Sequence, residues 1–186
     1  MEKVHKSKII FGSAALGIKG YGFNTLNKSS NLNHYLQYLQ NLGIKHIDTA
    51  PSYGNFEKKI GNFHKERKKQ FKIWTKVDGL IANSQFTQDK VNQSVRKSLS
   101  NLKVNSLECL YLHQNDCKIM DDRYINQALE SIKKNKFAKT IGVSIYKLEE
   151  LELALQKDIF DIIQLPVNIA NTFLYDIAKK NKANKK

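Results

Sequence analysis

The chain has 186 residues, of which 41% are hydrophobic and 10% aromatic, so it can bury one core and is not a wholly disordered protein. It contains no run of 18 apolar residues, so a membrane span is not expected. The charged amino terminus lacks the apolar segment of a secretory signal, and the two cysteines, Cys109 and Cys117, fit neither a zinc motif nor a disulfide framework. We therefore expect a cytoplasmic protein without a metal site.

The charge is strongly basic, with 31 Lys and Arg against 17 Asp and Glu and a net charge of +14. Such a balance is compatible with nucleic acid or an anionic membrane surface as a partner. Only Arg67, Arg96 and Arg123 are arginines, however, and arginine is the residue that best reads phosphates and base edges. We expect neither nucleic acid nor a membrane as the partner, and a basic nucleic-acid-binding module is the least favoured alternative. The charge does favour a small ligand that carries phosphate.

Short apolar segments alternate with segments of helical periodicity along most of the chain. In chain order the pattern predicts strand 8–11, helix 31–42, strand 44–47, helix 55–63, strand 71–75, helix 89–102, strand 107–112, helix 121–134, strand 140–144, helix 147–155, strand 159–165 and a last helix over 169–180. This alternation indicates a parallel sheet covered by helices. Two arrangements satisfy it, an open doubly wound sheet and a (β/α)8 barrel with parts missing. The glycines of segment 17–22 are a weak dinucleotide fingerprint, because no helix is predicted directly after them.

Polar side chains stand where the second, third and fourth predicted strands end. Asp48 ends the second strand and Tyr53 lies in the loop that follows it, while Lys76 and His113 end the third and fourth. Each residue taken singly has an ordinary explanation, such as a helix cap or a surface charge. Because the carboxyl ends of parallel strands share one face of the sheet, we expect these four side chains to converge there.

Two further polar residues stand at the ends of later strands, Ser144 at the fifth and Gln164 near the sixth. We interpret His46 and Tyr111, which lie within strands, as packing residues, and His64 as a solvated side chain.

Segment 43–61, with Asp48-Thr49-Ala50 followed by Tyr53-Gly54, resembles the first signature of the aldo/keto reductase family. The rest of the chain from residue 9 to about residue 168 is similar to the same family. Segments 11–22, 73–76, 94–113, 141–144 and 163–164 carry this similarity.

The resemblance implies a (β/α)8 barrel that reduces a small carbonyl substrate with a nicotinamide cofactor, usually NADPH, with NADH as the alternative. It implies that Tyr53 is the general acid that protonates the carbonyl oxygen and that His113 orients and polarises this carbonyl. Lys76, paired with Asp48, would lower the pKa of Tyr53, since an adjacent cation favours the ionised phenol. The matching positions Ser144 and Gln164 would hold the nicotinamide carboxamide.

The chain departs from the family pattern in two ways. Ile145 follows Ser144 where the family commonly has Asn, so one hydrogen bond to the carboxamide is expected to be missing. A (β/α)8 barrel typically needs ~250 residues, so only strands one to six are expected, with strands seven and eight missing. We predict a partial barrel over 1–178 and a Lys/Asn-rich disordered tail over 179–186.

An incomplete barrel leaves its first and sixth strands as edges. We expect exposed apolar surface near Ile162, Leu165 and Val167, and self-association through these edges. A catalytically inactive truncated fragment of a reductase is therefore the principal alternative to a working enzyme.

Overall fold

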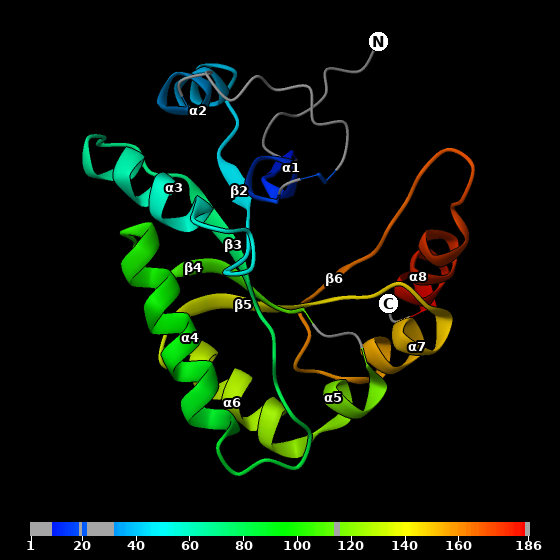
Figure 1. Ribbon diagram of the computed structural model, residues 1–186. Helices are drawn as coiled ribbons and strands as arrows, with labels where there is room; N and C mark the ends of the chain where they lie inside the picture. Colours follow the sequence, from blue (N-terminus) through cyan, green and yellow to red (C-terminus); the bar gives the residue numbers. More distant parts are fainter. Residues whose placement is uncertain (1–8, 19, 22–31, 114–115, 185–186) are drawn as a thin grey trace. The chain divides into compact units, whose positions relative to one another are not determined.

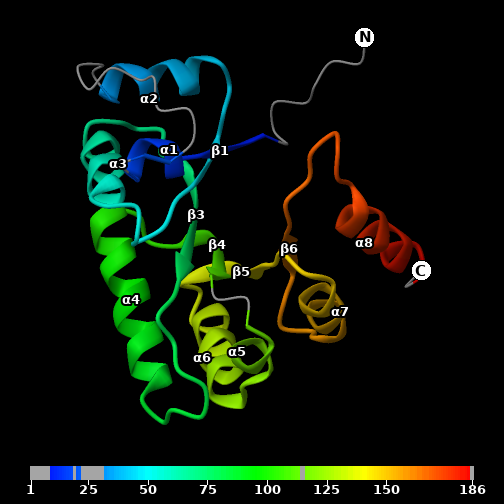
Figure 2. The same cartoon turned by 45° about the vertical axis from the view of Figure 1, so that its right-hand side comes forward.

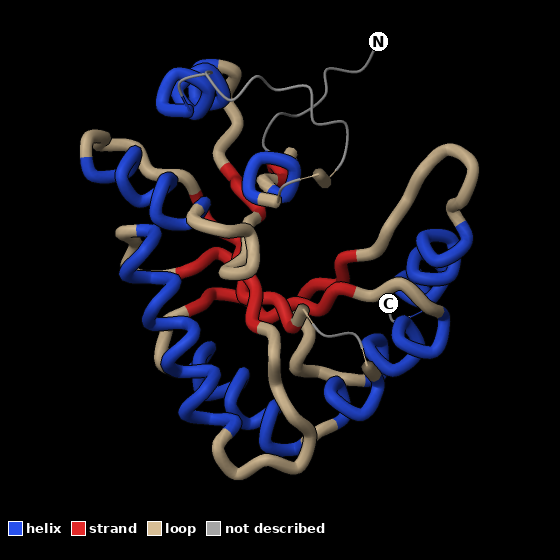
Figure 3. The backbone as a smooth tube through the Cα atoms, in the orientation of Figure 1, coloured by secondary structure: helices blue, strands red, loops and turns tan. Residues whose placement is uncertain are grey.

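The computed structural model describes residues 9–18, 20–21, 32–113 and 116–184. Strands and helices alternate along the chain (Figure 1). The elements are β1 (Ile10–Gly12), α1 (Ala14–Gly17), α2 (Leu32–Asn41), β2 (His46–Asp48), α3 (Phe56–Lys65), β3 (Lys72–Val77), α4 (Thr87–Leu102), β4 (Leu107–Leu112), α5 (Cys117–Asp121), α6 (Arg123–Lys134), β5 (Ala138–Ser144), α7 (Leu148–Gln156), β6 (Ile162–Gln164) and α8 (Phe173–Asn184). All six predicted strands are confirmed, and Figure 3 shows how the chain passes from each strand into helix before the next strand begins.

The strand order of the sheet is β1-β2-β3-β4-β5-β6, and the pairs β1–β2, β2–β3 and β5–β6 are parallel. A doubly wound sheet reverses its strand order at a switch point, and this sheet does not. The fold is therefore an incomplete (β/α)8 barrel, which decides between the two arrangements left open by the sequence. Within the described residues there are six strands, as expected.

The structure differs from the predicted elements in four places. The short helices α1 and α5, of 4 and 5 residues, were not expected. Strand β6 is shorter than predicted, since it ends at Gln164 and begins at Ile162. Helix α8 begins at Phe173 rather than at 169 and continues to Asn184, into the segment predicted as a tail.

Contacts divide the chain into two compact units. The first consists of Met1–Thr75 and Arg96–Glu108, and the second of Lys76–Val95 and Cys109–Lys186.

In the first unit, β2 lies between β1 and β3 in parallel register, with Ile47 opposite Ile73. Both isoleucines are at most 1% exposed, so they belong to the core that α2 and α3 help to bury. His64, at the end of α3, is also buried, with 1% of its surface exposed, so the interpretation of this residue as solvated was wrong.

In the second unit, α6 begins at a capping aspartate. The Asp122 carboxylate accepts a hydrogen bond from the Ile125 amide at 2.9 Å, which satisfies one of the free N–H groups of the first turn. The buried residues of α6 recur at helical spacing and form one face: Ile125, Ala128, Leu129 and Ile132. Helix α7 contacts α5 and α8, and Figure 2 shows α7 and α8 as neighbours.

The exposed apolar surface near β6 is only partly as predicted. Val167 is 50% exposed, as expected, but Ile162 and Leu165 are half-buried. The exposure continues instead into the segment before α8 and its first turn, where Ile169 is fully exposed and Phe173 is 56% exposed. Self-association through this surface stays a prediction.

None of the helices in the part of the chain that the structure describes has the length and apolar character that crossing a bilayer requires.

Candidate active site

Asp48 and Tyr53 belong to the first unit. Asp48 is the last residue of β2, where it stands opposite Trp74 of β3, and the Thr49 amide donates to the Trp74 carbonyl at 2.8 Å. Side chains alternate along a strand, so the half-buried Asp48 lies on the opposite face from the buried Ile47. This places the carboxylate at the carboxyl end of the strand, as the sequence predicts.

Tyr53 lies in the loop before α3 and is 9% exposed. The backbone of Gly17, the last residue of α1, lies directly against it. A Cβ at position 17 would come within 2.6 Å of the Tyr53 carbonyl oxygen and 2.7 Å of its Cβ. Only glycine allows this approach, so the unexpected helix α1 fixes the backbone of the loop that carries the phenol.

A buried carboxylate holds α3, which follows this loop, against β3. Glu57 is 4% exposed, and its carboxylate accepts hydrogen bonds from the Thr75 hydroxyl at 2.9 Å and from the side-chain amide of Asn101 at 3.3 Å. Thr75 directly precedes Lys76 in the sequence. Glu57 therefore stabilises the strand segment next to a second predicted site residue.

Lys76 and His113 belong to the second unit. Lys76 is 3% exposed, and its Nζ lies 5.9 Å from the centroid of the Tyr111 ring, at the outer limit of a cation–π contact. The Tyr111 ring packs against Gly142 of β5, where a Cβ would come within 2.5 Å of two ring carbons. The interpretation of Tyr111 as a packing residue agrees with this position, but its ring also lies close to the lysine.

His113 follows β4 directly, and its backbone amide donates to the Val77 carbonyl at 2.9 Å. Its Nδ1 lies 3.3 Å from a carboxylate oxygen of Asp78, the second residue after Lys76. Asp78 was not among the residues singled out from the sequence. The available signal was an acidic residue just past a strand end that already carries a candidate lysine.

Ser144 and Gln164 are brought together by the register of the second unit. They stand opposite each other on β5 and β6, and the Ser144 hydroxyl donates to the Gln164 side-chain oxygen at 2.8 Å. The Ile145 amide donates to the Gln164 carbonyl at 2.9 Å. The turn that follows is held by Glu150, whose carboxylate accepts from the amides of Tyr146 and Lys147 at 2.7 and 3.1 Å.

This pair has the donors and acceptors that a carboxamide needs. A serine oxygen that donates its one proton keeps lone pairs that accept, and a glutamine amide nitrogen carries two N–H donors. Ser144 and Gln164 are the last residues of β5 and β6, so the pair lies at the carboxyl ends of these strands. Ser144 is 4% exposed, whereas Gln164 is exposed. The residues present therefore fit the amide end of a nicotinamide.

Cys117, at the start of α5, does not have the character of a nucleophile. Burial, together with the nearby carboxylates of Glu150, Glu149 and Asp116, raises the pKa of its thiol. The thiolate, which is the reactive form, is therefore disfavoured. No group of three or more His, Cys, Asp and Glu side chains suited to a metal ion occurs within the described residues.

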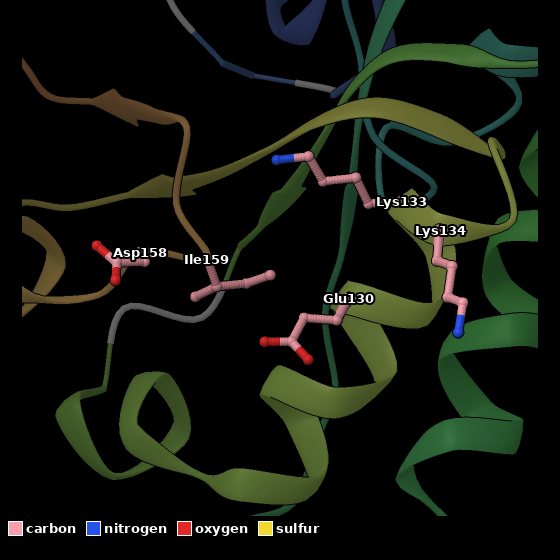
Figure 4. Close-up of a pocket in the computed structure, with 5 residues that line it drawn as sticks. All are labelled: Glu130, Lys133, Lys134, Asp158 and Ile159. Atoms are coloured by element: carbon pink, nitrogen blue, oxygen red, sulfur yellow. The ribbon is translucent and has the colours of Figure 1, made fainter.

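Two cavities lie away from the predicted site residues. One, of about 370 Å³, lies between the end of α6 and the segment before β6 and is lined by Glu130, Lys133, Lys134, Asp158 and Ile159 (Figure 4). The other, of about 350 Å³, is lined by residues 40, 43–45 and 69–72 of the first unit. Both lie at the amino ends of strands, whereas barrel active sites form at the carboxyl ends. In the first of these cavities, Lys133 is paired with Asp161 at 2.6 Å.

Each predicted site residue thus stands at or just after the end of a strand. Asp48 and Tyr53 lie in one unit, whereas Lys76 and His113 lie in the other, and the convergence of these four side chains stays a prediction. Ser144 and Gln164 are joined directly by a hydrogen bond.

The sequence profile of the aldo/keto reductase family matches residues 8–183. The oxidoreductase sirO of Leptosphaeria maculans is 30% identical over 150 residues, which are 77% of this chain and 44% of the relative. The 7-acetyl-epi-neemfruitin B aldo-keto reductase of Melia azedarach is 27% identical over 147 residues, which are 68% of this chain and 46% of the relative. The chain thus spans about half the length of the curated relatives it matches.

Solved structures of low sequence identity share the fold. A Pseudomonas aeruginosa protein assigned to the aldo-keto reductases superposes with a TM-score of 0.76 at 23% identity, over 95% of this chain and 70% of its own. A silkworm (Bombyx mori) aldo-keto reductase in complex with NADPH superposes with a TM-score of 0.67 at 23% identity, over 94% of this chain and 55% of the silkworm chain. The profile match covers nearly the whole sequence, and the chain therefore belongs to the aldo/keto reductase family.

Proposed function

We propose that the protein is an NAD(P)H-dependent oxidoreductase that reduces an aldehyde or ketone to an alcohol. The observation that carries this proposal is the family match over residues 8–183 together with the positions of Asp48, Tyr53, Lys76 and His113 at the ends of three successive strands. NADPH is the proposed cofactor, with NADH as the alternative, because a family member of the same fold binds NADPH.

The chain's own residues have distinct roles in the proposed reaction. Tyr53 donates its phenolic proton to the carbonyl oxygen as that oxygen gains negative charge. Lys76 carries a positive charge that stabilises the phenolate left on Tyr53, and Asp48 offsets the charge of the lysine. His113 orients the carbonyl. When bound, a reduced nicotinamide cofactor supplies the hydride that reaches the carbonyl carbon.

Ser144 and Gln164 would hold the carboxamide of the cofactor and so orient its nicotinamide ring. Their mutual hydrogen bond fixes the two side chains before a ligand arrives, which lowers the entropy cost of binding. Ile145 offers no side-chain hydrogen bond, so this site holds the amide with fewer contacts than the family pattern provides.

The test is a fluorescence titration of the purified chain with NADPH and, separately, with NADH. Trp74 is the single tryptophan of the sequence, stands opposite Asp48 in the sheet, and is a built-in reporter. We expect saturable quenching, weakened by Gln164→Ala and unchanged by Gln156→Ala, an exposed glutamine at the end of α7. A panel of aldehydes then tests turnover.

Absence of binding by a folded chain would contradict the proposal and favour an inactive piece of a reductase. The substrate itself follows from loops after the barrel strands, so the aldehyde panel, and not the fold, has to identify it.

A further inference from the structure

Asp78 and His113 form a side-chain pair that the proposed reaction has not used. The His113 Nδ1 and an Asp78 carboxylate oxygen are 3.3 Å apart. This is long for a charge-assisted hydrogen bond, as is common for active-site hydrogen bonds before substrate binds. The two side chains are 30% and 41% exposed, so the imidazole is accessible to a ligand and the carboxylate is partly hydrated.

The backbone brings the pair together independently of the side chains. Val77, the last residue of β3, accepts the His113 amide at 2.9 Å, so the residue after Val77 is held next to the histidine. Gly79 follows with a positive φ of 66°, and its carbonyl accepts a hydrogen bond from the Lys90 ammonium of α4. Asp78 is therefore held on both sides by contacts within the second unit.

An ionised carboxylate only accepts hydrogen bonds, so the imidazole nitrogen that faces it has to carry the proton. We propose that Asp78 is a positioning residue that fixes His113 in its Nδ1–H tautomer and so makes Nε2 the atom that meets the substrate oxygen. This inference rests on the role proposed for His113.

The tautomer decides what the histidine does. With Nδ1–H directed to Asp78, Nε2 of the neutral ring is an acceptor, and Nε2 donates a hydrogen bond only when the ring is protonated. The form of His113 that polarises a carbonyl is then the imidazolium, whose positive charge the Asp78 carboxylate offsets.

The test is a long-range ¹H–¹⁵N NMR spectrum of the full chain, which reports the tautomer of each neutral histidine ring without any turnover. The His113 signal is assigned by its loss in His113→Gln. We expect the Nδ1–H form in the wild-type chain and a shift toward the Nε2–H form, which free histidine prefers, in Asp78→Ala. Asp89→Ala is the matched control, since Asp89 is an exposed aspartate of the same unit.

A wild-type His113 in the Nε2–H form would overturn the proposal, and this result does not depend on how well the variant folds. The same tautomer of His113 in the wild type and in a folded Asp78→Ala would also overturn it. Where the wild-type chain reduces an aldehyde, Asp78→Ala is expected to lower kcat about tenfold with little change in KM. This is less than the ~10⁴ that a buried orienting aspartate contributes, because Asp78 is partly exposed. A chain without turnover contradicts the proposed function, while the NMR result still decides the inference.

Discussion

The Nδ1 atom of His64 lies 2.8 Å from the carbonyl oxygen of Leu102, and the opposite nitrogen, Nε2, accepts the backbone amide of Phe71 at 3.1 Å. Since Nε2 accepts, the ring is neutral and Nδ1 carries the proton. One buried side chain thus joins the end of α3, the residue before β3 and the end of α4.

This arrangement predicts a dependence of stability on pH. Burial lowers the pKa of His64 from its usual 6.5, an effect larger than the opposing hydrogen bond to Leu102. The unfolded chain then binds the proton more tightly than the folded chain, so acid favours unfolding. The stabilisation is complete above pH 6.5 and is lost as the pH falls through the window down to the lowered folded value, by at most about 1.4 kcal/mol per pH unit.

Urea unfolding between about pH 7.5 and pH 5.5 checks this prediction. We expect His64→Gln to be less stable at neutral pH and to have a flatter dependence on pH. His34→Gln, at an exposed position of α2, is the control and should keep the wild-type dependence. Parallel curves for the wild type and His64→Gln would show that another group is responsible.

The buried Glu57 carboxylate predicts a coupling between two side chains. Glu57→Leu leaves the Thr75 hydroxyl without its acceptor in a buried place, so we expect a loss of about 1–3 kcal/mol of unfolding free energy. Thr75→Val removes the polar group on the other side. The double variant should therefore lose less than the sum of the two single losses, because no unsatisfied hydroxyl remains. Strictly additive losses in denaturant unfolding would argue against the bond.

Gly142 predicts a steric effect on the strand beside Tyr111. A Cβ at Gly142 would lie 2.5 Å from the Tyr111 ring and 3.1 Å from the Cys109 sulfur, so Gly142→Ala forces these neighbours to move. We expect a loss of about 1–3 kcal/mol, as for other overpacked cores. Gly12→Ala is the matched control, since nothing lies within 4 Å of its Cβ, and thermal unfolding of the two variants makes the comparison. Equal stability of the two variants would mean that the Tyr111 ring can move aside without a measurable loss of stability.

The order of strands and long helices could be predicted from the sequence because each rests on local periodicity. Ile125, Ala128, Leu129 and Ile132 recur on one face of α6, and the structure buries all four. Helices α1 and α5 could not be predicted in this way, since 4 or 5 residues make little more than one helical turn and the apolar spacing cannot repeat.

The sequence predicts the positions of the candidate site residues at strand ends, and their roles stay a prediction. It does not predict which side chains they contact. Asp78 becomes a candidate only through its contact with His113, which lies 35 residues further along the chain. The buried His64 lies within hydrogen-bond distance of a carbonyl group 38 residues away. The first contact is set where His113, just after β4, hydrogen-bonds to Val77 at the end of β3, and the second where α3 packs against the end of α4. The sequence shows an acidic residue past a strand end, but it does not show which side chain or carbonyl group will lie opposite.

The last prediction concerns the proton that the proposed reaction needs. Tyr53→Phe removes the phenolic hydroxyl and keeps the ring that fills the 9%-exposed position after β2. We expect carbonyl reduction to fall by on the order of 10²–10⁴ in kcat, the usual contribution of a positioned proton donor. The affinity for NADPH should change little, because only the hydroxyl group that donates the proton is lost and the ring remains. Tyr146→Phe, at a 64% exposed position, is the control and should leave both quantities unchanged. Wild-type turnover in Tyr53→Phe, measured by the loss of NADPH absorbance, would assign the proton transfer to another group.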